Sequence, residues 1–131
     1  MTRLLDTSVC IPLINRSEPS LAKRLLAADP SSIVLCSVVR AELAFGARNS
    51  SRVAENLDRV EQFCSAFESL PFADSAADAY GEIRARLRRE GRPIGGNDLM
   101  IAAIAVASGL TLITRNVGEF KRVPKLATET W

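Results

Sequence analysis

The sequence predicts an α/β protein, a three-layer α/β/α sandwich around a central, mainly parallel sheet. Short runs rich in apolar and β-branched residues, such as "SIVLCS" at 32–37 and "LTLIT" at 110–114, are separated by stretches with helical periodicity. Strands joined through helices pair in parallel, and helices then cover both faces of the sheet. A chain of 131 residues can bury about two-thirds of its unfolded surface, so we expect a single domain spanning 1–131.

Strand and helix signals alternate in the first half of the chain. "RLLD" is a short apolar run that ends in an acid, and Thr7 or Ser8 can cap the helix that follows. A second helix ends at Asp29-Pro30, because the residue before a proline disfavours helical backbone. The expected elements are a strand at 3–6, helices at 7–16 and from Ser17 to Asp29, a strand at 32–37, and helices at 38–48 and 53–67.

The second half of the chain predicts two more helices. One spans 74–90 and turns an apolar face inward, and the other follows a loop at 91–96 and is opened by Asp98. A buried strand at 110–114 comes next, and the tail at 126–131 can add a short edge strand. The helix at 53–67 has an apolar stripe that can serve either the core or a protein interface, formed by Val53, Leu57, Val60, Cys64 and Phe67.

The composition excludes several kinds of catalysis. The chain has no histidine, which removes Ser-His and Cys-His nucleophiles, His-ligated zinc and a histidine general base. Seventeen basic and fifteen acidic side chains give a net charge of +2, which permits a polyanionic partner without indicating one. Any catalysis here must therefore depend on carboxylates and a hard cation.

The cysteines point to a reducing compartment. Cys10, Cys36 and Cys64 are far apart and form no C-x-x-C pair, so neither a disulfide framework nor a zinc site is expected. Each has apolar neighbours, which predicts buried, reduced thiols and a cytoplasmic protein. No apolar run reaches about 18 residues and no secretion signal is evident, so we expect no membrane association.

Several acidic and polar residues fall where parallel sheets form their sites. In open parallel sheets, sites lie beyond the carboxyl ends of the strands. Asp6 ends the first strand, Asn116 and Glu119 follow the strand at 110–114, and Asp98 opens the helix that feeds that strand. These positions predict that the side chains meet at one edge of the sheet.

Glu42 occupies an unusual place in its own helix. Plotted at about 100° per residue, it falls in the middle of an apolar arc formed by Val38, Val39, Phe45 and Gly46, while Ala47 lies on the other side. A carboxylate on an apolar face is costly unless a cation or a hydrogen-bond donor meets it. The simpler alternative is a buried Glu42 paired with an arginine.

Each of the other acids also has a purely structural alternative. Asp6 can be the N-cap of the next helix, and Asp98 in a first helical turn is favoured by the helix dipole. Glu119 alone is typical of a surface acid. If Asp6, Glu42 and Asp98 instead converge, carboxylates about 4 Å apart repel by on the order of 4 kcal/mol per pair. A bound Mg²⁺ or Mn²⁺ relieves that repulsion and can activate water at a phosphate.

Four segments together resemble a known family. "LLDTS", "SVVRAELAFGA", "IGGNDLMIAA" and "LTLITRNVGEFKRV" look like the successive signatures of PIN-domain ribonucleases, and more specifically of the VapC toxins of VapBC toxin–antitoxin pairs. The resemblance runs in order over most of the chain and is least distinctive between Asn49 and Ala79.

This resemblance implies a PIN-like α/β/α fold and a Mg²⁺- or Mn²⁺-dependent endoribonuclease. It makes Asp6, Glu42 and Asp98 the catalytic acids and metal ligands, with Ser8 supporting the first acid. Many PIN domains have Asp at the fourth acidic position, where this chain has Asn116. Glu119 is the residue that can substitute for it, through water, and so complete the catalytic set.

The resemblance also implies partners. "RNVGEFKRV" and the terminal "TETW" look most like VapC toxins that cut initiator tRNA in its anticodon stem-loop, so the expected substrate is RNA, with tRNA as the leading candidate. A VapB antitoxin is expected to wrap the chain and cover the acidic site, and a homodimer is implied. The alternative function is a catalytically silent PIN scaffold that binds RNA or a protein, and Asn116 is the one feature that favours it.

A group of arginines follows the helix at 74–90. These side chains can form an RNA-backbone clamp, because the planar guanidinium grips phosphate through two hydrogen bonds. Their structural alternative is a solvated helix end in which cations complement the helix dipole. The group consists of Arg84, Arg86, Arg88, Arg89 and Arg92.

Other phosphate chemistries fit the sequence poorly. A haloacid-dehalogenase-type phosphotransferase needs a second Asp two residues after the first, and that position is Ser8. A receiver domain needs a phosphoacceptor Asp at the end of a central strand, and "SIVLCS" ends without one. A P-loop is excluded because the chain has no G-K-[ST] sequence.

Overall fold

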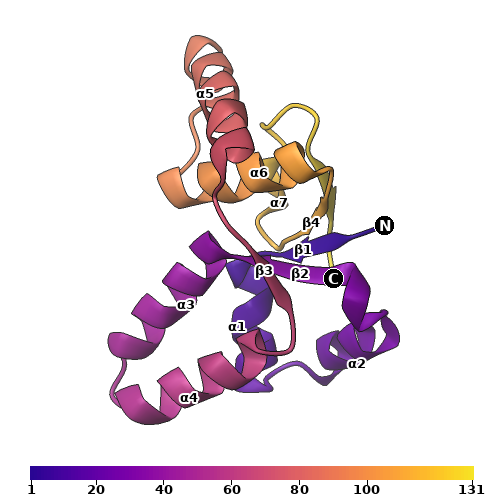
Figure 1. Cartoon of the computed structure of the whole chain (residues 1–131), viewed down its shortest axis with the longest axis vertical. Coiled ribbons are helices and arrows are strands. Elements are labelled where there is room, and N and C mark those ends of the chain that lie inside the picture. Colours follow the sequence, from indigo (N-terminus) through magenta and orange to yellow (C-terminus); the bar gives the residue numbers. More distant parts are fainter.

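The computed structural model describes residues 1–131, which form a parallel five-stranded sheet between two layers of helices (Figure 1). All four strand pairings are parallel and the strand order is β3-β2-β1-β4-β5, so the predicted α/β/α sandwich is confirmed. The strands are β1 (Arg3–Leu5), β2 (Ile33–Cys36), β3 (Glu68–Leu70), β4 (Thr111–Ile113) and β5 (Ala127–Glu129).

The helices divide between the two faces of the sheet. In Figure 1, α1 to α4 lie below the sheet, and α5, α6 and α7 lie above it. A single 3₁₀ turn at Pro30–Ser32 leads into β2. The helices are α1 (Thr7–Asn15), α2 (Pro19–Ala27), α3 (Ser37–Arg48), α4 (Val53–Cys64), α5 (Asp74–Arg89), α6 (Gly96–Ser108) and α7 (Val117–Phe120).

The two central elements of the core are β2 and α6. Every residue of β2 is buried, as expected for a strand covered on both faces. The run Ile101–Ala105 in α6 is also fully buried, because α6 packs between the sheet and α5. A helix enclosed on both sides needs apolar residues around most of its circumference, which is why "LMIAAIAVA" lacks a polar face. Because α6 is packed on two sides, the position of Asp98 in its first turn is fixed.

One predicted boundary was wrong and two short elements were missed. The helix expected at 53–67 ends at Cys64, and the next residues form the edge strand β3, which was not predicted. The short helix α7 was also not predicted. β3 has only three residues and none of them is fully buried, so its strand conformation comes from pairing with β2. In the stripe at 53–67, Cys64 is buried, and Val60 and Phe67 pack against the core.

The prediction for the cysteines agrees with the structure. Cys10, Cys36 and Cys64 are all free and buried, as predicted. Burial raises the pKa of each of these thiols, most strongly that of Cys10. None of the helices is both long enough and apolar enough to cross a bilayer.

Candidate functional site

The site begins where β1 and β4 end side by side. Leu5 pairs with Ile113 in register, and the amide of Asp6 donates a hydrogen bond to the carbonyl of Ile113 at 2.9 Å. This pairing places Asp6 next to Thr114, the residue that follows β4. Two segments more than a hundred residues apart therefore contribute adjacent polar side chains at the carboxyl edge of the sheet.

Asp6 is held in one orientation by two hydroxyl groups. Its Oδ2 accepts hydrogen bonds from Ser8 Oγ and from Thr114 Oγ1, each at 2.8 Å. Asp6 is only 4% exposed, so its carboxylate has little freedom. It does stand at the N-cap position of α1, but its side chain makes no capping hydrogen bond. The capping alternative therefore does not explain why this residue is an acid.

The two hydroxyl groups are themselves anchored by the backbone of the segment after β4. Ser8 Oγ accepts from the amide of Arg115 at 3.1 Å, and Thr114 Oγ1 accepts from the amide of Asn116 at 3.0 Å. Thr114 is completely buried and was not predicted as a site residue. The signal for it was present: a hydroxyl residue ends the otherwise apolar strand "LTLIT", beside the strand that carries the first acid.

Glu42 lies at the edge of the buried face of α3, not at its centre. The buried residues of α3 are Val38, Val39, Leu43 and Ala47. Phe45 is 70% exposed, so the predicted arc was wrong in placing Phe45 inward and Ala47 outward. The half-buried Glu42 accepts a hydrogen bond from Thr7 Oγ1 at 2.7 Å and forms no ion pair. The alternative of a glutamate paired with an arginine is therefore wrong.

Glu119 is fixed beside the start of α6. Its Oε1 accepts from the amide of Gly95 at 2.8 Å, and its Oε2 accepts from Nδ2 of Asn116 at 2.7 Å. These hydrogen bonds, with the Gly95 amide as the largest contribution, lower the pKa of Glu119. Glu119 is therefore not a free surface acid, and Asn116 serves to orient it.

Asp98 carries the strongest electrostatic signal of the site. Burial, the negative charge of Glu119 and a hydrogen bond with Glu119 raise the pKa of Asp98 to about 7. The charges of Asp6 and Glu42 raise it further. All four acids thus lie within electrostatic reach of one another at one edge of the sheet. Asp98 also stands in the first turn of α6, so the dipole alternative is compatible with this cluster.

These four residues, Asp6, Glu42, Asp98 and Glu119, are called the acidic cluster below. Its donors are all carboxylate oxygens, the ligand type that Mg²⁺ and Mn²⁺ prefer. Burial contributes most to the raised pKa of Asp98, and the negative charges of Glu119, Asp6 and Glu42 add to it; a cation would relieve that repulsion. No group of three or more Asp, Glu, His or Cys side chains is already gathered closely enough to hold a metal ion. The cluster fits a hard cation in chemistry and charge, and binding one requires its carboxyl groups to move together.

The five predicted arginines have different surroundings. All five are exposed, and α5 turns the four that it carries toward different sides. Arg86 forms an ion pair with Glu90 at 3.2 Å. Arg84 and Arg88 line a cavity that lies between α5 and the start of α6. Arg92 lies in the loop between these helices, so the sequence group divides into side chains with different surroundings.

A second cavity meets the acidic cluster at Glu42. It has a volume of about 220 Å³, lies between α1, α3 and α4, and is lined by Glu42 together with Ile14, Leu43 and Val60. Ile11, which also lines it, is 48% exposed, and Phe45 of α3 is 70% exposed. Apolar side chains left open to solvent beside an acidic site are typical of a surface that another chain covers.

The sequence matches the family model for the PIN domain over residues 3–126. It is 39% identical to "Ribonuclease VapC2" of Rickettsia felis over 132 aligned positions, covering 100% of this chain and 98% of that protein. It is 38% identical to the "tRNA(fMet)-specific endonuclease VapC" of Shigella flexneri, covering 98% of this chain and 96% of that protein.

Solved structures agree with the sequence relatives. The toxin–antitoxin complex VapBC2 of Rickettsia felis, bound to a DNA fragment from its promoter, contains a chain that superposes with a TM-score of 0.94 at 38% identity. That match covers 100% of this chain and 99% of the other. DNA-bound VapBC of Salmonella typhimurium gives a TM-score of 0.95 at 37% identity, with coverage of 100% and 98%. The protein described here therefore belongs to the PIN-domain family and, within it, to the VapC ribonucleases.

Proposed function

We propose that this protein is a divalent-metal-dependent endoribonuclease that hydrolyses RNA phosphodiester bonds at the acidic cluster. The observation that carries the proposal is the convergence of four carboxyl groups at one edge of the sheet, where burial of Asp98 and its three acidic neighbours raise its pKa to about 7. The relatives named as ribonucleases or endonucleases cover nearly the whole chain and support the same activity.

The residues of the cluster have distinct roles in this proposal. Asp6 and Asp98 hold the ion, with Glu42 beside them, and Ser8 and Thr114 keep the carboxylate of Asp6 in a fixed orientation. Glu119 is held in place by Gly95 and Asn116 and completes the cluster. A bound Mg²⁺ or Mn²⁺ supplies activation of water and neutralises charge on the phosphate. No side chain needs to act as a covalent nucleophile.

Asn116 does not argue for a catalytically silent scaffold. Its amide donates to Glu119 and so keeps a carboxylate at the fourth acidic position. The amide thus supports an acid instead of replacing one, which favours the enzyme over the binding module. RNA bound without cleavage by the purified protein, in the presence of Mg²⁺ or Mn²⁺, would reverse this choice.

We propose tRNA as the substrate, with initiator tRNA as the first candidate to test. The support is the name of the Shigella flexneri relative, a tRNA(fMet)-specific endonuclease, and its 38% identity over nearly the whole chain. The test compares cleavage of initiator and elongator methionine tRNA by the purified protein, with mapping of the new RNA ends. Equal cleavage of both RNAs would contradict the specificity and leave the ribonuclease activity intact.

The activity itself is tested with acid-to-amide variants. Asp6→Asn and Asp98→Asn should abolish metal-dependent cleavage of tRNA, because each removes a carboxylate from the cluster. Asp78→Asn is the matched control, since Asp78 is an exposed acid on α5. Circular dichroism establishes that all three variants fold. Undiminished cleavage by Asp6→Asn or Asp98→Asn would sink the proposal.

We also propose that a VapB-type antitoxin covers the acidic cluster by docking on α1, α3 and α4. The solved relatives are VapBC complexes, and this surface exposes Ile11 and Phe45 beside Glu42. A partner seated there buries both apolar side chains and can direct a cation to the cluster. The homodimer implied by the family resemblance stays a prediction.

A further inference from the structure

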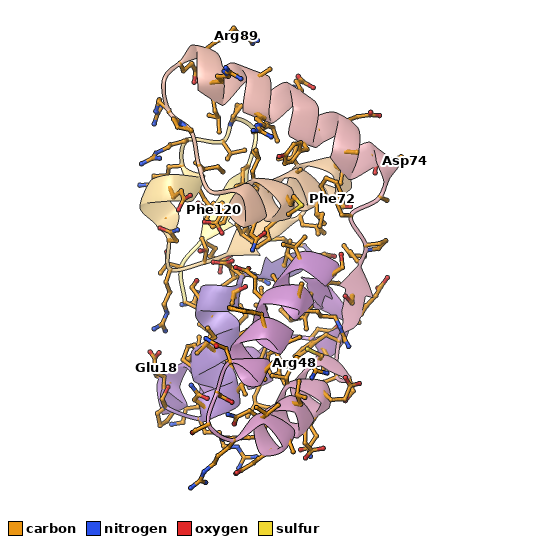
Figure 2. The ribbon with its side chains drawn as sticks, turned by 90° about the vertical axis from the view of Figure 1, so that its left-hand side faces the viewer. Glu18, Arg48, Phe72, Asp74, Arg89 and Phe120 are labelled. Atoms are coloured by element: carbon orange, nitrogen blue, oxygen red, sulfur yellow. The ribbon has the colours of Figure 1, made fainter.

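A cavity of about 370 Å³ separates α5 from the beginning of α6, and the proposed reaction does not use it. Figure 2 shows α5, with Asp74 and Arg89 at its two ends, lying over α6. The apolar side of the cavity is formed by Leu87, Ile94 and Leu99, and its polar side by Tyr80, Arg84 and Arg88. Its size is within the range of about 300–1,000 Å³ that is usual for small-ligand sites.

The cavity adjoins the acidic cluster through one turn of helix. Gly96 and Leu99 of α6 line the cavity, and Asp98, between them in sequence, belongs to the cluster. Glu119 accepts its hydrogen bond from Gly95, the residue just before this turn. The cavity and the acidic cluster therefore share the first turn of α6, which is the reason for assigning both to one RNA strand.

Arg84 is positioned before any ligand arrives. Its guanidinium lies 5.8 Å from the centre of the Tyr80 ring, and its Nη1 donates to the Tyr80 hydroxyl at 2.9 Å. Tyr80 is held in turn by an edge-on contact with Phe72, with ring centres 5.9 Å apart. A cation that is already ordered loses less conformational entropy on binding an anion than a free arginine would.

The two arginines on the polar side of the cavity have no acidic partner. Arg88 lies one turn after Arg84 on the same face of α5, and neither forms an ion pair. Arg86, on a different face, pairs with Glu90. The cavity thus combines two unneutralised guanidinium groups with an aromatic ring and aliphatic walls.

We propose that this cavity binds one nucleotide of the RNA, adjacent to the phosphate that is cleaved. Arg84 and Arg88 hold its phosphate, and its base lies against Leu87, Ile94 and Leu99. A nucleotide is the ligand class that presents both an anion and a flat, largely apolar ring, so it matches both sides of the cavity. This inference rests on the proposed ribonuclease function, because it makes the cavity a subsite of the same reaction.

The first test maps binding on the whole protein by NMR. The four 5′-ribonucleoside monophosphates and inorganic phosphate are titrated separately, at millimolar concentration. We expect the nucleotides to shift the methyl signals of Ile94 and Leu99 and the Nε signals of Arg84 and Arg88. Phosphate alone should shift only the arginine signals. No shifts with any nucleotide, or identical shifts with phosphate and nucleotides, would overturn the proposal.

The second test separates this cavity from general electrostatic attraction. The double variant Arg84→Ala/Arg88→Ala should raise KM for a fluorescein-labelled tRNA about tenfold and lower kcat much less. It should also reduce the slope of log affinity against log salt by about 0.7 to 0.9 for each phosphate that is no longer bound. The control double variant Arg86→Ala/Arg89→Ala removes the same charge from the same helix and should change KM less than about twofold. Equal effects of the two double variants would overturn the proposal.

Failure of this inference is distinguishable from failure of the proposed function. If Asp98→Asn abolishes cleavage and both double variants behave alike, the ribonuclease stands and the nucleotide site is wrong. If the wild-type protein cleaves no RNA while the nucleotides still shift the cavity signals, the ribonuclease is wrong and the nucleotide site remains.

Discussion

The carboxyl group of Asp98 lies within interaction range of that of Glu119, although one residue opens α6 and the other lies in α7. Two neighbouring carboxyl groups repel when both are ionised, and that repulsion is relieved when one of them keeps its proton. Glu119 receives the Gly95 amide and the Asn116 side chain, which favour its charged form. The proton therefore stays on Asp98, whose pKa rises to about 7.

This proton makes the stability of the protein depend on pH at Asp98. Below about pH 4, the carboxyl is protonated in both the folded and the unfolded chain, so it does not make the free energy of unfolding depend on pH. As the pH rises from there to about 7, the carboxyl ionises readily in the unfolded chain, whereas burial and three neighbouring acids oppose its charge in the folded chain. The free energy of unfolding therefore falls as the pH rises through about 7. Asp98→Asn avoids this cost. It should raise the free energy of unfolding at pH 8 by about 1 kcal/mol, a value discounted because the side chain is partly exposed.

Urea unfolding of the wild type and of Asp98→Asn at pH 4, 6 and 8 measures the effect. The difference between the two proteins should be small at pH 4 and should grow up to pH 8. Asp78→Asn, which removes an exposed acid from α5, should show no such trend. A wild type as stable as Asp98→Asn at pH 8 would contradict the charge accumulation at the cluster.

Binding of a divalent metal ion should offset the cost of ionising Asp98 in the folded chain. We expect Mg²⁺ or Mn²⁺ to raise the melting temperature of the wild type, by an amount that corresponds to about 2.7 kcal/mol at a hundredfold excess over Kd. The rise should be greater at pH 8 than at pH 6, because binding requires the carboxyl of Asp98 to be ionised. Differential scanning fluorimetry with and without EDTA checks this. A melting temperature that does not respond to either ion would refute metal binding at the cluster.

Thr114 should matter for both folding and activity. Thr114→Val keeps the shape of the side chain but removes the hydroxyl that donates to Asp6 and accepts from the Asn116 amide. We expect a loss of about 1–2 kcal/mol in the free energy of unfolding and a fall of about 10- to 100-fold in RNA cleavage. Thr111→Val is the control, because Thr111 is buried in β4, the strand that leads to Thr114, and its hydroxyl makes no hydrogen bond within the protein. Equal losses in the two variants would remove the special role of Thr114.

Phe45 should be important for the antitoxin and unimportant for the fold. Phe45→Glu places a charge on a side chain that is 70% exposed, so the melting temperature should change little. Binding of the VapB-type antitoxin should weaken by about 30-fold or more, because the variant removes an apolar anchor of the proposed surface. Leu26→Glu is the control, since Leu26 is 83% exposed on α2, which is not one of the helices of the proposed docking surface. Unchanged affinity measured by calorimetry in Phe45→Glu would place the antitoxin elsewhere.

Local patterns in the sequence were sufficient for the order and type of most elements. Continuous apolar runs predicted β1, β2 and β4, and helical periodicity predicted α1 to α6, because these signals depend on residues close together in the chain. The same local signals placed Asp6 and Asp98 at the ends of a strand and a helix. They failed at β3 and α7, which have few residues and form through their neighbours.

Packing alone decided which of these residues meet. The contact between Asp6 and Thr114 exists because β1 pairs with β4, which no local pattern encodes. The separation of Arg84 from Arg86 depends on which face of α5 lies over α6, and the exposure of Phe45 depends on how α3 is covered. Contacts across a sheet follow from strand order and helix packing, which are settled by burial over the whole chain, so only the tertiary structure could determine them.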